Sequence, residues 1–363
     1  MGRFILAGLL AALVLGTSPS SMAQDEWRQE WEKVLAAAKK EGTVAVLGPR
    51  QVQARDVLVG FGKVYGIKVE YLGGSGRTIS PRVLSERRAQ RYGWDVYVGG
   101  TTTGLTALGP AGALDPLAPA MILPTVKDPE YWRDGHHEYA DRAGKLQLGF
   151  AVTRRSTIMI NPKLVKPEEI RSHRDLLDPK WTGKIVMDDP RRSGPGQATF
   201  LFFLLHPDLG ADFIRALAKQ KAVLLADYQQ ELDGLAHGRY PILLGSSDAS
   251  AEYKISQGVP IHIVDPRQLK EGTDAGTSNG AVGLMNQAPH PNAARVFINW
   301  LLSKEAQTGY SKNMQYVSRR LDVPTDHMRE WRIPPPGTIG TYSEDALDKK
   351  DALLALLREV FGR

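Results

Sequence analysis

Apolar positions follow two different periods along the chain, and the two periods alternate. One places an apolar residue every three or four positions, which is typical of a helix with one buried face. The other is a run of about five apolar residues bounded by small or polar ones, which is typical of a strand buried on both faces. Their alternation predicts parallel strands joined by right-handed helical crossovers, and therefore an α/β fold.

This alternation occurs in two separate series, and each series predicts one lobe. The first predicts strands at 43–47, 67–72 and 94–98, with helices at 26–41, at 57–66 and from Ser80-Pro81 onward. The second predicts strands at 184–189, 222–226 and 240–245, with helices at 197–205, 208–219 and 228–238.

Two extended segments connect the series. Residues 146–161 show no helical pattern, and residues 278–285 form a second extended run before the helix at 293–303. Two extended crossings between two lobes are what a molecule that closes about a hinge requires. The predicted fold is thus two α/β lobes with parallel-rich sheets, joined by two extended hinge strands.

The N-terminal pattern predicts export. Arg3 precedes an unbroken apolar run from Phe4 to Leu15, and Ser21-Met22-Ala23 fits the small-x-small rule for a cleavage site. A secretory signal peptide has these features, and the run is too short to span a bilayer; the alternative is a buried N-terminal helix. The predicted division is a signal peptide at 1–23, lobe 1 at 24–150 plus 280–320, and lobe 2 at 151–279 plus 321–363.

Composition narrows the function classes. The 363 residues contain no cysteine, so disulfides do not contribute to stability, and a two-lobed chain must rely on its cores. The formal net charge is +6, but the densest basic run is only "ERRAQR" at 86–91, which we interpret as an exposed helix face. We therefore expect no nucleic-acid partner, whereas a mildly basic surface suits a protein that handles small anions.

Small residues fill five loops at the predicted carboxyl ends of strands. In open α/β sheets, ligands bind at that edge, and small residues let a ligand approach backbone amides. The loops at 73–78 and 191–196 lead directly into helices, whose free N–H groups favour anions. The alternative is that these glycine-rich loops are turns and nothing more. The five loops are 48–51, 73–78, 99–103, 191–196 and 245–250.

Signatures of catalysis are missing. The segment "GSSDA" departs from G-x-S-x-G at its last position, and neither a P-loop nor a full G-x-G-x-x-G is present. The cluster "HHE" at 136–138 lacks the second-ligand spacing of a zinc motif. The sequence therefore predicts no catalytic residue, no cofactor and no metal ligand.

Several motifs in order resemble one known family. They are "EGTVAVLG", "FGKVYGIKVEYLGGSGR", "WDVYVGG", "LLDPKWTGKIVM", "RRSGPG" and "PNAARVFINWLLSKEAQ", spread from about Trp27 to Pro324. In them the chain resembles the two-lobed periplasmic solute-binding proteins of ABC importers, in the type II branch that includes the ferric-iron-binding proteins. The resemblance implies a periplasmic, monomeric receptor that closes about its hinge and delivers its ligand to a permease in the inner membrane.

The iron ligands of that branch are not retained. Its iron-binding members carry a histidine after the first strand, a glutamate after the "DV" strand and two adjacent tyrosines after the strand at 240–245. As aligned, Arg50 stands for the histidine and Gly100 for the glutamate, while the tyrosine pair falls within Ser247–Ser250; Tyr253 is the nearest tyrosine. The family's Ser-Gly loop for a synergistic anion matches Ser193-Gly194.

The expected cargo is therefore a small organic anion: a carboxylate, a phosphonate or a phosphate ester. Asp248 is unusual in such a site, because a buried acid needs a partner. It pairs with an amine or hydroxyl of the ligand, pairs with an arginine, or caps the helix that begins near Ala249. The predicted ligand-binding residues are Arg50, Ser75, Gly76, Arg77, Gly100 and Thr101 from lobe 1, and Ser193, Gly194, Gly196, Ser246 and Asp248 from lobe 2.

Two other functions stay open. One is binding of ferric iron at a non-standard site, or of a ferric chelate held by arginines through its carboxylates. The other is an exported enzyme on the same scaffold, for which Asp248 and Ser193 are the candidate reactive groups, although no histidine lies in the five loops to activate a serine.

Overall fold

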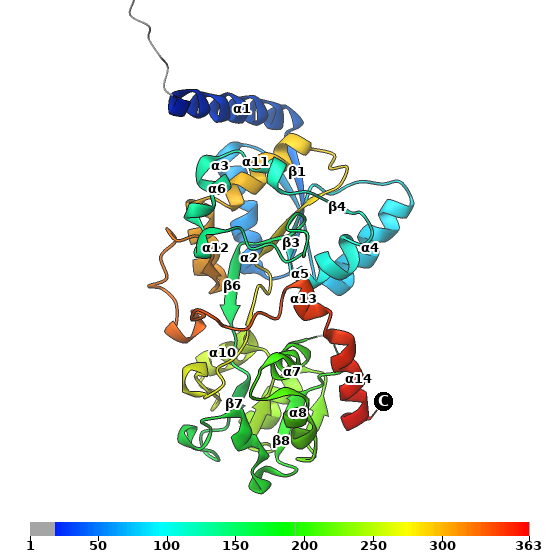
Figure 1. Ribbon diagram of the computed structural model, residues 1–363, viewed down its shortest axis with the longest axis vertical. Coiled ribbons are helices and arrows are strands. Elements are labelled where there is room, and N and C mark those ends of the chain that lie inside the picture. The colour runs from blue at the N-terminus through cyan, green and yellow to red at the C-terminus, as the bar shows by residue number, and fades with distance from the viewer. Residues whose placement is uncertain (1–18, 193, 363) are drawn as a thin grey trace, which may run out of the picture.

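The structure is a computed structural model that describes residues 19–192 and 194–362. Two lobes lie one above the other along the long axis of the molecule, and strand β6 (Ala151–Arg154) passes between them (Figure 1). Lobe 1 is built on one sheet and lobe 2 on another, as the two alternating series predict.

The sheet of lobe 1 has the strand order β2-β1-β3-β13-β4, with β5 paired to β13. Its first three strands are parallel and follow one another through helices. Strand β13 runs antiparallel to β3 because the chain reaches it from the hinge and not through a helical crossover. The bounds are β1 (Thr43–Pro49), β2 (Lys68–Gly74), β3 (Val96–Gly99), β4 (Leu114–Asp115), β5 (Leu148–Gly149) and β13 (Ala281–Met285).

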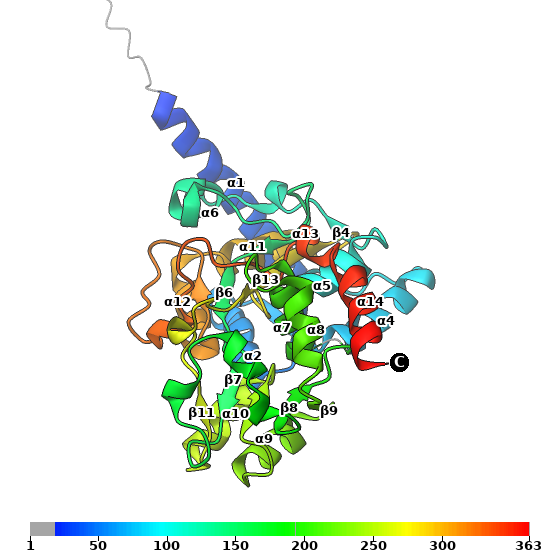
Figure 2. The same ribbon diagram turned by 60° about the horizontal axis from the view of Figure 1, so that its bottom comes forward.

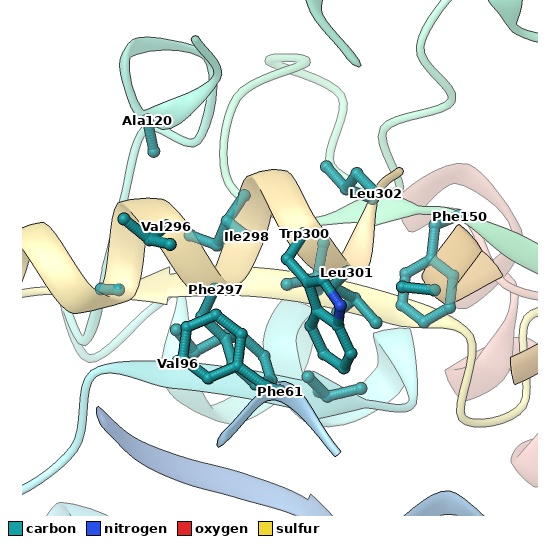
Figure 3. Close-up of a cluster of buried hydrophobic side chains, with 14 of the residues drawn as sticks. Phe61, Val96, Ala120, Phe150, Val296, Phe297, Ile298, Trp300, Leu301 and Leu302 are labelled. Carbon is teal, nitrogen blue, oxygen red and sulfur yellow. The ribbon is translucent and has the colours of Figure 1, made fainter. Parts of the chain in front are cut away.

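Helices cover this sheet and form its core. Phe61 lies in edge contact with Phe297 and Trp300, with ring centroids 5.1 and 5.3 Å apart (Figure 3). Such contacts bury large apolar areas and dominate the stability of a core. The helices are α1 (Pro19–Glu41), α2 (Val52–Val59), α3 (Phe61–Tyr65), α4 (Gly76–Arg88), α5 (Thr101–Thr103), α6 (Pro124–Lys127), α11 (Pro291–Leu301) and α12 (Lys304–Met314).

The sheet of lobe 2 has the order β11-β7-β10-β8-β9. Strands β8, β9 and β10 are parallel, whereas β7 enters from the hinge and is antiparallel to β10. Phe200, Phe203 and Phe213 meet in the core between helices α7 and α8. The bounds are β7 (Ile158–Ile160), β8 (Ile185–Asp188), β9 (Val223–Leu225), β10 (Ile242–Leu244), β11 (His262–Ile263), α7 (Pro195–Leu205), α8 (Gly210–Ala218), α9 (Tyr228–Ala236) and α10 (Asp248–Ser256).

A third, small sheet forms the hinge. Strand β6 pairs antiparallel with β12 (Ala275–Gly276) and with β14 (Val317–Ser318). The second crossing therefore uses β12 and not the expected segment 278–285, most of which is β13 of lobe 1. The predicted lobe boundaries themselves stay a prediction.

The C-terminal tail adds a connection between the lobes that the sequence did not predict. After β14 the tail pairs with β12 through Gly340 and then forms α13 (Glu344–Leu347), where Glu344 N–H donates to Ala140 O of lobe 1. It ends in α14 (Lys350–Phe361), which packs on α7 and α8 of lobe 2 (Figure 2). Both lobes thus contact the tail.

Two of the predicted helices differ from those in the structure. The predicted helix at 57–66 is two helices, α2 and α3, that meet at Gly60. The expected helix start at Ser80-Pro81 is wrong, because Ser75 is the cap and α4 continues through Pro81. Residues 1–18 of the predicted signal peptide lie outside the described residues, and residues 19–23 belong to α1. No helix in the described part of the chain is long and apolar enough to cross a membrane.

Candidate functional site

A cavity of about 370 Å³ lies between the lobes, against the hinge sheet; we call it the hinge cavity. Lobe 1 contributes Gln51 and Gln53 at the start of α2 together with the last residues of α12 and those that follow it, whereas lobe 2 contributes the start of α10. Its lining consists of Gln51, Gln53, Thr153, Arg155, Pro195, Ser246, Ser247, Asp248, Glu252, Ser278, Asn313, Met314, Gln315, Tyr316 and Arg332.

Two arginines line the hinge cavity. Arg155 directly follows hinge strand β6 and is paired with the buried carboxylate of Asp274. Arg332 comes from the C-terminal tail, where its Nη2 lies 2.8 Å from Glu252 Oε1 and its Nη1 donates to Thr153 Oγ1 at 3.3 Å. A guanidinium carries five N–H donors, so one partner carboxylate leaves donors for a second anion.

Asp248 shares this cavity with the two arginines. It is the first residue of α10, and Ser247 is the cap, accepting from Ser250 N–H at 3.3 Å. The alternative that Asp248 caps the helix is therefore wrong. Its Oδ2 accepts from Ser156 N–H at 3.1 Å, whereas its Oδ1 is buried without a hydrogen-bond partner among the described residues. Burial raises the pKa of Asp248 to about 7, although Arg332 and Arg155 act to lower it.

Two residues with strained backbone lie where the hinge strands meet the cavity. Ser278 follows β12 with φ 48°, and Gln315 precedes β14 with φ 55°. A side chain other than glycine in this left-handed region costs on the order of 1–2 kcal/mol. Tyr316 supports the arrangement, because its hydroxyl donates to Ser278 Oγ at 3.0 Å. Both strained residues line the cavity, so this strain lies at the hinge and beside the ligand space.

The loops of lobe 2 behind the cavity are occupied by the chain's own carboxyl groups. Gly196 N–H, in the first turn of α7, donates to Asp188 Oδ2 at 2.8 Å. Ser246 Oγ donates to Glu231 Oε2 at 2.5 Å, and burial raises the pKa of Glu231 to about 7. The Gly196 amide is therefore not free for a ligand. The prediction from the sequence had assumed that it was free.

Close packing explains the small residues of these loops. Gly245, the last residue of the run at 240–245, has φ 71°, and an added Cβ would lie 3.0 Å from Gly196 Cα. An added Cβ on Gly194 would lie 3.0 Å from Asp188 Oδ2. Because the two loops pack on each other, their glycines serve the contact between strands β8 and β10 as much as any ligand.

The predicted loop of lobe 1 opens into a different space. A second cavity of about 390 Å³, the α4 pocket, is lined by Ser75, Gly76, Ser80, Thr102, Thr103, Thr106, Ala107 and Lys350. Ser75 caps α4, and its N–H donates to Thr78 Oγ1 at 3.0 Å. Lys350 belongs to α14, so this pocket too lies between the lobes. Arg77 is the second residue of α4, and its side chain is outside the described part of the structure.

Three more of the predicted residues, Arg50, Gly100 and Thr101, line neither cavity. Arg50 is exposed in the loop after β1, beside Gln51 of the hinge cavity. Thr101 is buried, with its Oγ1 3.4 Å from Thr277 Oγ1, and an added Cβ on Gly100 would lie 3.0 Å from Ser278 O. Ser193 lies outside the described residues. Of the predicted site, the structure brings Ser246 and Asp248 together in the hinge cavity, and Ser75 and Gly76 in the α4 pocket.

Sequence reasoning missed both cavity arginines. Arg155 stands at the end of the predicted crossing 146–161, so its place at the hinge was available from the pattern. Arg332 precedes "IPPPG" in a tail without periodicity, and no sequence signal places it beside β6. Among the described residues, no three His, Asp or Glu side chains are grouped as they would be to hold a metal ion.

Comparison with known proteins places this geometry in context. A model of a family described as bacterial extracellular solute-binding protein matches residues 58–332. Iron uptake protein A1 of Synechocystis sp. is 26% identical over 265 residues, covering 68% of this chain and 67% of that protein. The matching family is thus described by its binding of solutes.

Solved structures share the fold at low identity. The Trichodesmium protein IdiA (FutA) in complex with iron and citrate has a TM-score of 0.63 and 19% identity, covering 89% of this chain and 100% of that one. The periplasmic binding protein AfuA from Actinobacillus pleuropneumoniae with fructose 6-phosphate bound has a TM-score of 0.60 and 19% identity, covering 88% and 98%.

Proposed function

Because this chain belongs to the bacterial extracellular solute-binding proteins, which deliver small ligands to ABC permeases in the inner membrane, we propose that its cargo is a small organic anion held in the hinge cavity. The anion is a carboxylate, a phosphonate or a phosphate ester. The observation that carries the proposal is the convergence of Arg155 and Arg332, from the hinge and the tail, on one cavity between the lobes.

The two guanidinium groups suit an anion better than other cavity residues do. Arginine matches carboxylate and phosphate oxygens with two parallel N–H donors. Arg155 is 20% exposed and Arg332 is 7% exposed, so a ligand would meet both in a partly desolvated space, where a charge-assisted hydrogen bond is worth about 1.5–3 kcal/mol.

Closure of the lobes follows from where the lining residues lie. Gln51 and Gln53 stand on lobe 1, whereas Ser246 and Asp248 stand on lobe 2, and β6 joins the two walls. A ligand that contacts both walls stabilises the closed form by the difference in its contacts between the open and closed states. We infer that the permease recognises this closed form.

Ferric iron, free or as a chelate, is the second candidate. It is supported by the iron uptake relative and by the fold shared with a protein that holds iron and citrate. A ferric chelate with free carboxylates would suit Arg155 and Arg332, whereas bare Fe(III) prefers hard oxygen ligands such as phenolates. Tyr253, the tyrosine nearest the family's pair, is 66% exposed and does not line the hinge cavity.

A thermal-shift screen separates the candidates. The purified chain is heated with carboxylates, phosphonates, sugar phosphates, Fe(III) alone, and Fe(III) with citrate. A ligand at one hundred times its dissociation constant adds roughly 2.7 kcal/mol to stability. We expect an organic anion to raise the melting temperature without iron, and the rise to be lost in Arg332→Gln but kept in Lys350→Gln. Stabilisation by Fe(III) alone, with no response to any organic anion, would overturn the proposal.

A further inference from the structure

We propose that the ligand is a hydroxylated anion and that Asp248 is the residue that selects it, by accepting a hydrogen bond from a ligand hydroxyl next to the group held by Arg155 and Arg332. This inference rests on the proposed function, since it assumes that an anion occupies the hinge cavity. It adds the chemical class of that anion and a specificity-determining residue.

Asp248 is an acid in a cavity that we propose to bind an anion, where a second negative charge is unfavourable. Asp248 lines the same cavity as the two arginines, and a carboxylate there opposes the binding of a second negative group. One of its oxygens is satisfied by Ser156 N–H at 3.1 Å. The other, Oδ1, is buried and has no hydrogen-bond partner among the described residues. Buried polar atoms are normally paired, so an orphaned acceptor at a cavity wall indicates a donor on the ligand.

Asp248 is also held firmly in place. Ser247 caps α10 directly before it, and the Ser156 amide that it accepts from lies between β6 and β7. The charges of Arg332 and Arg155 act on its carboxyl group, which places it within electrostatic reach of both guanidinium groups. A ligand whose acidic group meets the arginines therefore presents its neighbouring atoms to Asp248.

The rest of the lining distinguishes a hydroxyl from an ammonium group. Gln51, Gln53, Asn313 and Gln315 line the cavity with amides, which both donate and accept and so match several hydroxyls at once. An ammonium ligand would need further carboxylates, and the other acid in the lining, Glu252, is already paired with Arg332 at 2.8 Å. The lining therefore favours a hydroxylated anion over a zwitterion.

Matched probes on one carbon skeleton test this directly. Succinate, malate and tartrate carry zero, one and two hydroxyls, and aspartate replaces the hydroxyl of malate with an ammonium group. Propyl phosphate and glycerol 3-phosphate form the corresponding pair for phosphate esters. Dissociation constants are measured by calorimetry for the wild-type chain and for Asp248→Ala, Asp248→Asn and Asp212→Ala. Asp212 is a fully exposed acid on α8 and serves as the matched control.

We expect the wild-type chain to bind the hydroxylated member of at least one series about tenfold or more tightly than the member without hydroxyls. In Asp248→Ala this preference falls to within about threefold, while the affinity for the member without hydroxyls is kept or rises, because the opposing charge is gone. Asp248→Asn keeps an acceptor and the shape, so it retains part of the preference. Asp212→Ala behaves as the wild type, and circular dichroism confirms that each variant is folded.

Other outcomes reject either the role of Asp248 or the proposed function as well. Anion binding with equal affinity for both members of each series, or a hydroxyl preference that survives Asp248→Ala, rejects the role of Asp248 and leaves the proposed function intact. Tightest binding of aspartate, lost in Asp248→Ala, replaces the hydroxylated anion with a zwitterion. Absence of binding for every organic anion in the wild-type chain rejects the proposed function and this inference together.

Discussion

The hinge cavity and the α4 pocket are similar in size, about 370 and 390 Å³, and both lie between the lobes. The α4 pocket has the features from which an anion site is predicted in a sequence: a helix start, glycine, hydroxyl groups and one lysine. The hinge cavity has instead two partly buried arginines, an orphaned carboxylate oxygen and strained backbone. The charged groups suited to a ligand thus lie at the hinge, where segments that are distant in sequence meet.

The largest expected effect is on the free energy of unfolding, when a glycine beside each cavity is replaced by alanine. An added Cβ on Gly196 would lie 2.3 Å from the backbone oxygen of Asp188, whereas one on Gly76 would meet the Thr103 hydroxyl, which can rotate away. We expect Gly196→Ala to lower the free energy of unfolding by about 3 kcal/mol or more, and Gly76→Ala to change it by less than about 1 kcal/mol. Urea denaturation of both variants measures this, and equal losses would mean that the two loops are equally tight.

Removing a charge from each cavity gives the next effect. We expect Arg332→Gln to weaken binding of the best anion about 100-fold, or about 2.7 kcal/mol, because a charge-assisted hydrogen bond is lost. Lys350→Gln should weaken it less than about twofold, because the α4 pocket does not hold the ligand. Calorimetric titration of the two variants decides between the cavities, and a larger loss in Lys350→Gln would reverse their roles.

The pH dependence of stability should arise from acids around the hinge cavity. The pKa of Glu231 is raised from 4.5 to about 7 in the folded chain, so folding takes up a proton between those values. Its contribution to stability is full below pH 4.5 and is lost as the pH rises through 7, on the order of 3 kcal/mol. Glu231→Gln should therefore flatten the stability profile between pH 5 and 7, as urea unfolding at several pH values would show. An unchanged slope would mean that this carboxyl is ionised in the folded state.

The smallest effect is expected at the tail. Arg142 of lobe 1 is paired with Asp345, at 2.7 Å, and with Asp348 near the start of the C-terminal helices. All three side chains are more than half exposed, and solvent screens such pairs so that they contribute little to stability. We expect Arg142→Ala to lower the melting temperature by only a few degrees and to leave anion affinity unchanged. A large loss of affinity would instead show that the tail sets the opening of the lobes.

How much of the molecule was predictable depends on how local each feature is. Strands such as 43–47 and helices such as 197–205 follow from their own apolar spacing, and the structure confirms them. Helix α4 begins at Gly76 because Ser75 and Thr78 bond to each other, a pairing that outweighs the Ser80-Pro81 signal. Arg332 could not be found, because only the folded tail brings it within 3.3 Å of Thr153.

The small loops show the same limit in another way. Their glycines correctly marked the carboxyl ends of the strands, yet Gly196 uses its amide for Asp188. Whether an amide is free depends on which side chain folds over it, and spacing along the chain does not contain that information.

The most direct test is a crystal structure of the chain with the anion that stabilises it most in the screen. The account predicts electron density for that anion between the lobes, with its acidic group on Arg155 and Arg332 and a hydroxyl facing Asp248. Density for the anion at Ser75, Gly76 and Lys350, or a ferric ion bound directly by side chains, would contradict it.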